Sequence, residues 1–367
     1  MTRIYLIRHA EAEGNLYRIA QGQYNSILTD RGWRQVEALR QRFAAIPIDA
    51  VYASDLYRTC ATAGAIYRSQ GLELHRRRDL REICVGRWEQ MTWGDIARTD
   101  GEQLVNFNLH PEKWHVEGAE TPDQVLDRVL AAVRQIAAEN EGKTVAVVSH
   151  GYAIRLLLAE LQGYTLDQLS ATPVGGNTAV SLVEAENGQM RVVFRDDTSH
   201  LQTAAYLAGE RPRKRDSALE PGLYFEPLRL PEQSDFFTAC VSSVWEESGA
   251  AEAFDAARLL ADAARRPTLV GYLEGRPVSL VQMGPENGWI SLACVSPEYR
   301  GRGFGVQLLG QAVQHTRARE GSALRLVLNG SGGAGGFFRS FGFREEDAAE
   351  GGKTALVKNI GYDPEYL

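Results

Sequence analysis

The chain has 367 residues and a formal net charge of −7. At roughly 100–200 residues per domain, this length predicts two domains, each able to bury its own core. Hydrophobic residues make up 44% and charged residues 24%, which excludes a disordered, collagen-like or disulfide-based chain. Both halves, divided near residue 207, are net acidic, so a nucleic-acid or anionic-membrane surface is not expected and small molecules are the expected partners.

The first residues do not resemble a secretion signal, because Arg3, Arg8 and Glu11 interrupt any apolar stretch. No later apolar run approaches the roughly 20 residues that a membrane span requires. The four cysteines include no C-x-x-C pair, which argues against a zinc knuckle or a disulfide framework. We therefore expect a cytoplasmic protein with reduced thiols.

The first half alternates predicted strands and helices. Short β-branched runs predict buried strands, and a capping box at Thr121 and Gln124, with Pro122 between them, predicts the start of a helix. Ser54 and Asp55 are expected to cap the helix that follows the second strand, and His150-Gly151 opens another. The predicted strands are 3–7, 49–53, 144–149, 178–184 and 190–195, and the predicted helices begin near 31, 56, 122 and 151.

A linker is predicted at 208–222, where basic residues, Pro and Gly follow one another without an apolar period. A tail or a surface loop is the alternative. The domains are accordingly expected at 1–207 and 223–367. In the second, strands are predicted at 223–228, 268–273, 277–283, 288–295, 323–328 and 353–358, and helices at 232–247, 252–264, 303–319 and 334–340.

Three predicted strands of the first half lead into residues suited to bind an anion. Strand 3–7 leads to Arg8 and His9, strand 49–53 to Arg58 in the next helix, and strand 144–149 to His150. The carboxyl ends of parallel strands share one edge of a sheet, where helix N-termini also favour anions. Two Arg and two His are therefore expected to meet there.

The segments LIRHAEAEGN, SDLYRTCATA, LREICVGRWE and VSHG resemble, in order and spacing, the motifs of the histidine phosphatase (phosphoglycerate mutase-like) superfamily over about residues 1–205. The resemblance implies a three-layer α/β/α fold. It implies that His9 is the nucleophile that takes the phosphoryl group, for which a neutral imidazole is suited. It also implies that the phosphate is held by Arg8, Asn15, Arg58 and His150.

Glu82 matches the acid of the family, which protonates the leaving oxygen and later deprotonates the attacking water. Gln21 and Gly22 match a pair beside the family's substrate pocket. His200 matches a further family position, for which a structural role is the alternative. No metal is implied, because the histidines show no ligand spacing such as HExxH.

Hydrolysis and mutase transfer share all these residues, so both activities stay open, and we favour a phosphatase. The region between Glu82 and Thr121 is rich in aromatic residues and is either a lid over an organic leaving group or part of the core. Its large aromatic residues include Trp88, Trp93, Phe107 and Trp114.

The second half contains a glycine-rich turn between a predicted strand and a predicted helix, which suits a pyrophosphate at the helix N-terminus. The stretch from Val295 to Gly305 and the segment LRLVLNGSGGAGGFFRSFGF resemble GNAT-type N-acetyltransferases over about 223–360. The resemblance implies an α+β fold with a central mixed sheet that binds acetyl-CoA. The implied binding residues are Val295, Arg300, Gly301, Arg302, Gly303, Phe304, Gly305 and Asn329.

Phe338 departs from the family pattern, in which a Tyr commonly protonates the leaving thiolate, and a phenyl ring has no proton to donate. Three alternatives stay open. Water, Asn329 or a substrate group replaces the Tyr as proton donor, the domain binds acyl-CoA without transfer, or the domain is structural.

The sequence thus predicts a metal-independent phosphatase joined to a GNAT-like domain that binds acetyl-CoA, and acetylation of an amine by this domain stays open. The alternative from another class is a sensor that binds a phosphometabolite and CoA without turnover. The presence of both His9 and Glu82 favours turnover, because a binding protein needs no nucleophile and acid.

Overall fold

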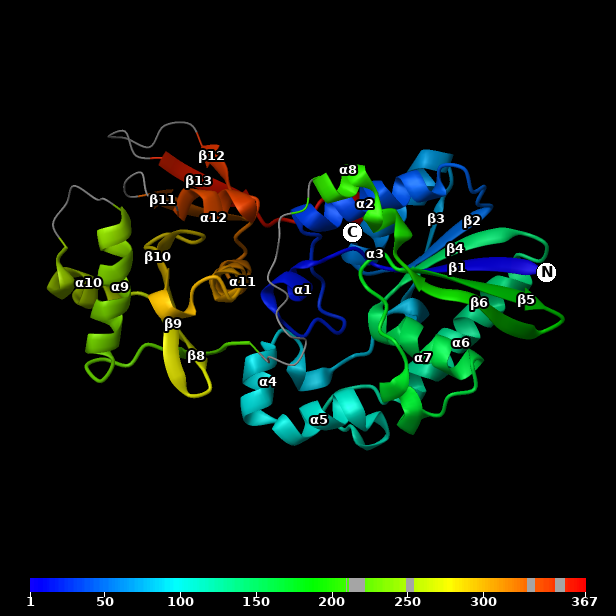
Figure 1. Ribbon diagram of the computed structural model, residues 1–367, viewed down its shortest axis with the longest axis horizontal. Coiled ribbons are helices and arrows are strands. Elements are labelled where there is room, and N and C mark those ends of the chain that lie inside the picture. Colours follow the sequence, from blue (N-terminus) through cyan, green and yellow to red (C-terminus); the bar gives the residue numbers. More distant parts are fainter. Residues whose placement is uncertain (209, 211–221, 249–253, 329–333, 347–353) are drawn as a thin grey trace.

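A six-stranded sheet forms the centre of the first half of the chain. The computed structural model describes all residues except 209, 211–221, 249–253, 329–333 and 347–353. The strand order is β3-β2-β4-β1-β5-β6, in which the first four strands run parallel, β5 runs antiparallel to β1, and β6 runs antiparallel to β5 (Figure 1). The strands are β1 (Thr2–Arg8), β2 (Ala50–Ser54), β3 (Leu74–Arg77), β4 (Thr144–Ser149), β5 (Val180–Glu186) and β6 (Gln189–Asp197).

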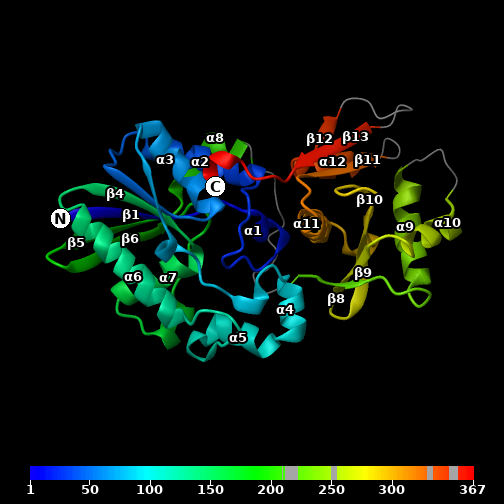
Figure 2. The same cartoon turned by 180° about the vertical axis from the view of Figure 1, so that it is seen from behind.

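Helices cover both faces of this sheet, as alternation along β1 requires. Tyr5 and Ile7 pack with residues of α2 (Asp30–Phe43) and α3 (Tyr57–Gln70), while Ile4 and Leu6 pack with residues of α6 (Pro122–Glu139) and α7 (Gly151–Leu161). Figure 2 shows the same layers from behind. The three-layer α/β/α fold predicted from the sequence is confirmed.

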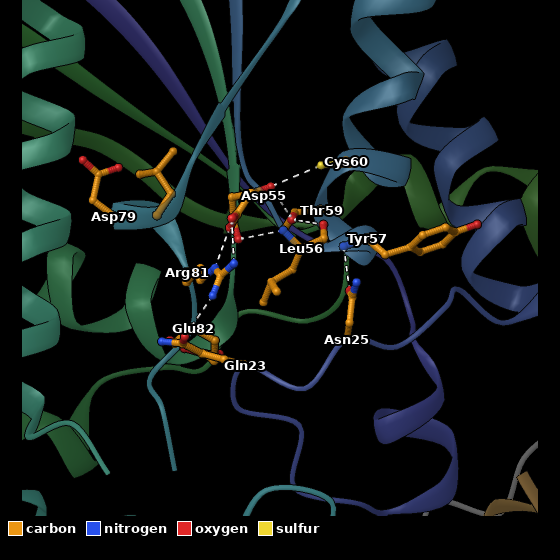
Figure 3. Close-up of polar contacts among 12 residues, drawn as sticks. Gln23, Asn25, Asp55, Leu56, Tyr57, Thr59, Cys60, Asp79, Arg81 and Glu82 are labelled. Carbon is orange, nitrogen blue, oxygen red and sulfur yellow. Dashed lines mark hydrogen bonds and ion pairs between the residues drawn. The ribbon is translucent and has the colours of Figure 1, made fainter. Parts of the chain in front are cut away.

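Helix α6 begins as predicted, with a capping box. The Thr121 hydroxyl accepts from the Gln124 amide at 3.3 Å, and the Gln124 side chain accepts from the Thr121 amide at 2.9 Å. The predicted cap of α3 is wrong: its N-cap is Leu56, without a side-chain cap. Asp55 instead pairs with Arg81 at 2.6 Å (Figure 3). Ser54 Oγ lies 2.9 Å from the His150 ring.

The aromatic region after Glu82 belongs to the core, which is one of the two alternatives left by the sequence. It contains α4 (Trp93–Thr99) and α5 (Gly101–Leu109). Trp88 and Trp114 are 0% and 4% exposed, with ring centroids 5.7 Å apart, and Phe107 lies against both. The Trp88 indole also donates to Asp100 Oδ2 at 2.8 Å.

The second half contains two antiparallel sheets with the orders β10-β9-β8-β7 and β11-β13-β12. A parallel bridge between Trp289 and Arg325 joins them, so the predicted mixed sheet is confirmed. Helices α9 and α11 pack on opposite sides of β9 and β10. The strands are β7 (Tyr224–Pro227), β8 (Thr268–Leu273), β9 (Arg276–Met283), β10 (Ile290–Val295), β11 (Ala323–Leu328), β12 (Arg344–Glu346) and β13 (Thr354–Asn359), and the helices are α9 (Ser234–Ser248), α10 (Ala256–Ala263), α11 (Phe304–Arg317) and α12 (Ala334–Ser340).

Helix α1 (Glu13–Tyr17) of the first half lies against α11 of the second (Figures 1 and 2). Tyr17 and Ile19 are part of the core around α11, and a Cβ at Gly310 would lie 2.6 Å from the Tyr17 Cβ. Only glycine allows this close approach. The C-terminal residues return to α3, where the Tyr366 and Tyr57 rings lie 5.6 Å apart.

The remaining short helix, α8 (Ala204–Ala208), precedes the predicted linker, of which residues 209 and 211–221 lie outside the described part of the chain. None of the helices that the structure describes combines the length and apolar character needed to cross a bilayer.

If the aromatic region is core, Trp88→Ala should lower the free energy of unfolding by about 3–5 kcal/mol, because it removes a buried indole and leaves a cavity. Urea unfolding followed by circular dichroism measures this loss. Trp33→Ala, at a side chain that is 38% exposed, is the matched control and should cost much less. Equal small losses for both variants would contradict the core assignment and favour a lid.

Candidate functional site

The carboxyl edge of the first sheet brings four side chains together, of which Arg8 is the last residue of β1. His9 directly follows β1, His150 directly follows β4, and Arg58 lies in the first turn of α3 after β2. The two imidazole centroids are 5.3 Å apart. His9, Arg58 and His150 are 3%, 1% and 0% exposed, so the cluster is buried.

His9 is held as a neutral ring with one nitrogen free to react. Its Nδ1 lies 2.7 Å from the Ala10 carbonyl, which assigns the ring proton to Nδ1 and leaves the lone pair on Nε2. Burial, followed by the charges of Arg58 and Arg8, holds the pKa of His9 well below its usual value. The imidazole is therefore uncharged at neutral pH.

The two guanidinium groups are held by carbonyl oxygens. Arg58 donates to the Gly22 carbonyl at 2.7 Å and the Tyr24 carbonyl at 2.8 Å, and Arg8 donates to the Gly175 carbonyl at 2.5 Å. Burial lowers the pKa of Arg58 to about 10 and also lowers that of Arg8.

Three nitrogen atoms in the cluster are buried without a hydrogen-bond partner among the described residues: Arg8 Nε, Arg58 Nε and His150 Nδ1. Because an unpaired buried polar group is costly, these atoms are suited to bind a ligand. His150 Nε2 already contacts Ser54 Oγ, and burial with nearby Arg58 lowers the pKa of His150 well below its usual value. The positive charge of the guanidinium groups makes an anion the fitting ligand.

Glu82 reaches the same edge from the loop after β3. Its carboxylate accepts from the Tyr152 amide at 3.1 Å and the Ala153 amide at 3.0 Å, in the first turn of α7. Its charge favours the protonated forms of Arg8 and Arg58. The Glu82 carbonyl accepts from Arg128 and Gln23, which hold the loop in place. Gln23 and Arg81 lie beside it in Figure 3.

The other predicted residues of this site lie in the loops after β1. Asn15 Oδ1 accepts from the Ala12 amide at 3.0 Å and from Asn177 Nδ2 at 3.3 Å. The Gln21 side chain accepts from Ser26 at 2.6 Å and packs against Gly14.

Gly22 has φ = 45°, a conformation that favours glycine, and a Cβ there would lie 2.1 Å from a Glu89 carboxylate oxygen. Its carbonyl is thereby presented to Arg58.

Sequence reasoning missed Asn177 and Thr178, which support the main chain of the cluster. The Thr178 amide donates to the Arg8 carbonyl at 3.1 Å, and Asn177 Nδ2 donates to the His9 carbonyl at 3.1 Å. These residues reach this edge because β5 runs antiparallel to β1, and the strand pattern alone does not give that direction.

His200 supports Thr178 rather than the cluster itself. Its Nε2 lies 3.0 Å from Thr178 Oγ1 and its Nδ1 lies 3.2 Å from an Arg42 nitrogen. This arrangement favours the structural alternative. Burial, together with the charge of Arg42, lowers the pKa of His200 to about 4.

The second predicted site surrounds the start of α11. Gly301 and Gly303 have φ = 74° and 82°, and Gly303 is the N-cap of α11, without a side-chain cap. Arg300 Nε donates to the Val295 carbonyl at 2.9 Å.

Side chains pack on both sides of this glycine loop. The Arg302 guanidinium lies 5.1 Å from the Phe304 ring centroid, and Gly305 lies against the Phe337 ring. Phe338 is 8% exposed and packs edge-on against Phe343. Asn329 lies outside the described residues.

Metal-ligating side chains do not cluster in the part of the chain that the structure describes: no group of three or more His, Cys, Asp or Glu residues could hold an ion there.

Two family models match this chain. That of the histidine phosphatase superfamily (branch 1) matches residues 4–198, which is more than half of the chain. That of an acetyltransferase (GNAT) domain matches residues 243–353.

Several curated relatives and solved structures are similar to the first half. A metal-independent phosphoserine phosphatase of Arabidopsis thaliana is 30% identical over 211 residues, which cover 56% of this chain and 86% of the relative. A probable phosphoglycerate mutase GpmB of Proteus mirabilis is 31% identical over 176 residues, 44% of this chain and 76% of the relative. The solved structure of Bacillus stearothermophilus YhfR matches with a TM-score of 0.54 and 31% identity, over 55% of this chain and all of that structure.

The lowered pKa of His200 predicts a pH dependence of stability. Between the unfolded value near 6.5 and the folded value of about 4, the unfolded chain binds a proton that the folded chain does not, so acid favours unfolding. In His200→Asn, the loss of stability from pH 7 to pH 4 should be smaller by up to about 3 kcal/mol.

Urea midpoints at pH 7, 5.5 and 4 measure this difference. His75→Asn, at an exposed ring, is the control and should keep the wild-type slope. A wild-type slope in His200→Asn would contradict the assignment.

Proposed function

The chain belongs to the histidine phosphatase superfamily, and on this premise we propose that its first domain, residues 1–207, hydrolyses phosphomonoesters through a phosphohistidine at His9. The observation that carries the proposal is the buried cluster of two Arg and two His with three unpartnered nitrogen atoms, whose chemistry fits an anion. The free Nε2 of a neutral His9 supports it further, because the neutral imidazole is the nucleophilic form.

In the first step, His9 Nε2 attacks phosphorus and the bond between phosphorus and the ester oxygen breaks. Arg8, Arg58 and His150 hold the phosphoryl oxygens, and the guanidinium charges stabilise the negative charge that they carry in the transition state. Asn15 adds a hydrogen bond on the same side. Glu82 gives its proton to the leaving oxygen, so that an alcohol departs.

In the second step, Glu82 takes a proton from water, whose oxygen attacks phosphorus. The bond between phosphorus and Nε2 breaks, inorganic phosphate forms, and His9 returns to its neutral state. The guanidinium groups supply the positive charge in both steps, so the proposed reaction needs no metal. The Arabidopsis relative, whose name states metal independence, supports this view.

We propose phosphorylated amino compounds, with phosphoserine as the first example, as the substrate class. The support is the name of the Arabidopsis relative and the presence of an acetyltransferase-like domain, whose acceptor would be an amine. Gln21 and Gly22 border the pocket that would take the organic part. One pathway would then use both domains, and we place it in the cytoplasm, where the four free cysteines stay reduced.

Mutase transfer is the second candidate, which the similarity to a probable phosphoglycerate mutase favours. In a mutase the phosphohistidine passes its phosphoryl group to a second hydroxyl instead of water. Incubation with a bisphosphorylated donor and a monophosphorylated acceptor distinguishes the two, because efficient transfer without phosphate release would identify a mutase.

The second domain, proposed at 223–367 after a linker at 208–222, is proposed to bind acetyl-CoA. The residues fit this cofactor: the left-handed glycines at 301 and 303 expose main-chain amides at the N-terminus of α11, which has no side-chain cap. Residues 300–305 would hold the pyrophosphate and the main chain at Val295 the pantetheine arm. Bound acetyl-CoA supplies a thioester, an activated acetyl group.

Acetyl transfer to an amine is a further proposal, and Phe338 argues against fast transfer. Its ring is packed in the core beside Phe343 and carries no proton donor. Binding of acetyl-CoA without fast transfer is therefore expected unless Asn329, water or the substrate supplies the proton.

The phosphatase proposal predicts that His9→Ala releases no phosphate from phosphoserine in EDTA, because no phosphohistidine can form. For Glu82→Gln, kcat with phosphoserine should fall by about 10²–10⁴-fold, because the alkoxide leaves unprotonated. The loss with p-nitrophenyl phosphate should be much smaller in the first step, because that leaving group needs no proton. Malachite-green and absorbance assays measure both.

Glu102→Gln, at an exposed carboxylate, is the control for charge loss and should retain full activity. Mass spectrometry of a reaction quenched in base should detect phosphohistidine in wild type. Equal losses of Glu82→Gln on both substrates in kcat/KM, which reports the first step, would contradict the role as acid, and activity in His9→Ala would contradict the nucleophile.

For the second domain, acetyl-CoA should raise the melting temperature, because a ligand that binds only the folded state stabilises it. Gly303→Val should abolish this shift, because a β-branched residue at φ = 82° is strained and covers the amides. Gly188→Val, at a left-handed glycine of the first domain, is the control and should keep the shift. No shift in wild type at millimolar acetyl-CoA would contradict cofactor binding.

A further inference from the structure

Arg317, the last residue of α11, joins the second half of the chain to the first. Its guanidinium group contacts both oxygens of Glu13 in α1, at 2.6 and 3.2 Å, and donates to the Tyr24 hydroxyl at 3.2 Å. It also donates twice to the Ile360 carbonyl, at 3.0 and 2.5 Å. The side chains of Arg317 and Glu13 are 13% and 5% exposed, so this bidentate pair is largely removed from water.

A second contact lies beside the first. The Tyr362 hydroxyl donates to the Asn25 carbonyl at 2.7 Å, and the Arg317 guanidinium lies 5.3 Å from the Tyr362 ring centroid. Arg317 and Tyr362 therefore fix two consecutive residues, Tyr24 and Asn25, of one loop in the first half. We call residues 22–25 the Arg58 loop.

The Arg58 loop is what holds Arg58. The Gly22 and Tyr24 carbonyls accept from the two terminal nitrogens of its guanidinium group. Asn25 Oδ1 also accepts from the Tyr57 amide at 2.8 Å, one residue before Arg58 at the start of α3 (Figure 3). The position of Arg58 thus depends on this loop at the side chain and at the helix start.

The first half also supports the Arg58 loop, and Gln23 contacts Glu82, Glu120 and Arg81 there. Glu89 accepts from the Gln23 amide at 2.8 Å and the Tyr24 amide at 2.6 Å. Arg317 and Tyr362 contact the loop at different atoms, a side-chain hydroxyl and a main-chain carbonyl. Both halves therefore contact the loop that holds a buried guanidinium group, whose misplacement by about 1 Å would be costly for phosphate binding.

We propose that Arg317 and Tyr362 are positioning residues for Arg58, so that the phosphate pocket of the first domain is complete only when the second domain is docked. This inference rests on the proposed function, in which Arg58 holds the phosphoryl group. It assigns the acetyltransferase-like domain a role in the phosphatase reaction that does not depend on acetyl-CoA.

The test compares two kinds of full-length variant. The first kind removes contacts between the second half and the Arg58 loop, and the second removes a contact between the two halves at another place. Glu13→Gln/Arg317→Met removes both charges of the pair and so leaves no lone buried charge. Tyr362→Phe removes only the hydroxyl. Arg98→Ala is the matched control, because Arg98 of α4 pairs with Glu226 across the same two halves at 3.2 Å, away from the Arg58 loop.

Titration calorimetry with inorganic phosphate in EDTA measures the affinity of the pocket directly, and p-nitrophenyl phosphate gives kcat and KM. The double variant should weaken phosphate binding and raise KM by about tenfold, and Tyr362→Phe by about threefold, as expected for hydrogen bonds lost at a distance from the ligand. Arg98→Ala should stay within about twofold of wild type.

A double-mutant cycle separates positioning from general loosening. In an Arg58→Met background, Tyr362→Phe should not weaken phosphate binding further, because the residue that it positions is gone. Circular dichroism confirms that each variant is folded.

Three results would overturn the proposal: unchanged phosphate affinity in the folded loop variants, an equal loss in Arg98→Ala, or full additivity with Arg58→Met. Failure of the proposed function is distinguishable from these. A wild type that binds phosphate and hydrolyses no ester would refute hydrolysis alone, since the affinity comparison still decides the positioning role. A wild type that binds no phosphate would overturn both.

Discussion

The burial of two guanidinium groups beside two imidazoles is the constraint on which the rest of the first domain depends. Removing Arg8 and Arg58 from water lowers the pKa of each, so their charges must be compensated by dipoles and by a ligand. Carbonyl oxygens of the loops after β1 and before β5 provide the dipoles. These loops therefore have to converge on one edge of the sheet, which the parallel order of β2, β4 and β1 and the antiparallel β5 make possible.

The need to hold the loops around the buried guanidinium groups also explains why the two halves pack so closely. Helix α11 carries the glycine loop at one end and Arg317 at the other, and its 14 residues span about 21 Å. A rigid helix therefore fixes the distance between the proposed acetyl-CoA site and the Arg58 loop. Gly310, in the middle of α11, lets Tyr17 of α1 approach, so α1 and α11 share one core. The two proposed sites are connected by packed structure rather than by a linker alone.

Much of this could be predicted from sequence where a local pattern carries the information. The bounds of β8, β11 and α12 agree with the predicted ranges, and Arg8, His9, Arg58 and His150 meet because they follow parallel strands. Main-chain acceptors such as the Gly22 and Tyr24 carbonyls have no residue signature, so the loop that holds Arg58 was not predictable. The contact between Glu13 and Arg317, 304 residues apart, follows from docking of the two halves and from no local preference.

If the cluster binds phosphate as proposed, its charges also select among phosphate compounds. At neutral pH, His9 and His150 are uncharged because their pKa values are held low, whereas Arg58, with a pKa of about 10, remains protonated, as Arg8 does. With Glu82 in the protonated form that the first step requires, the cluster thus presents two positive charges, which equal in magnitude the charge of a phosphomonoester dianion. A phosphodiester has only one negative charge, and its second ester group would occupy a position where the buried donors bind an unsubstituted phosphoryl oxygen. In the proposed reaction, burial therefore has two effects: it keeps the His9 nitrogen reactive by keeping the imidazole neutral, and it places the two guanidinium charges where they would bind a dianion.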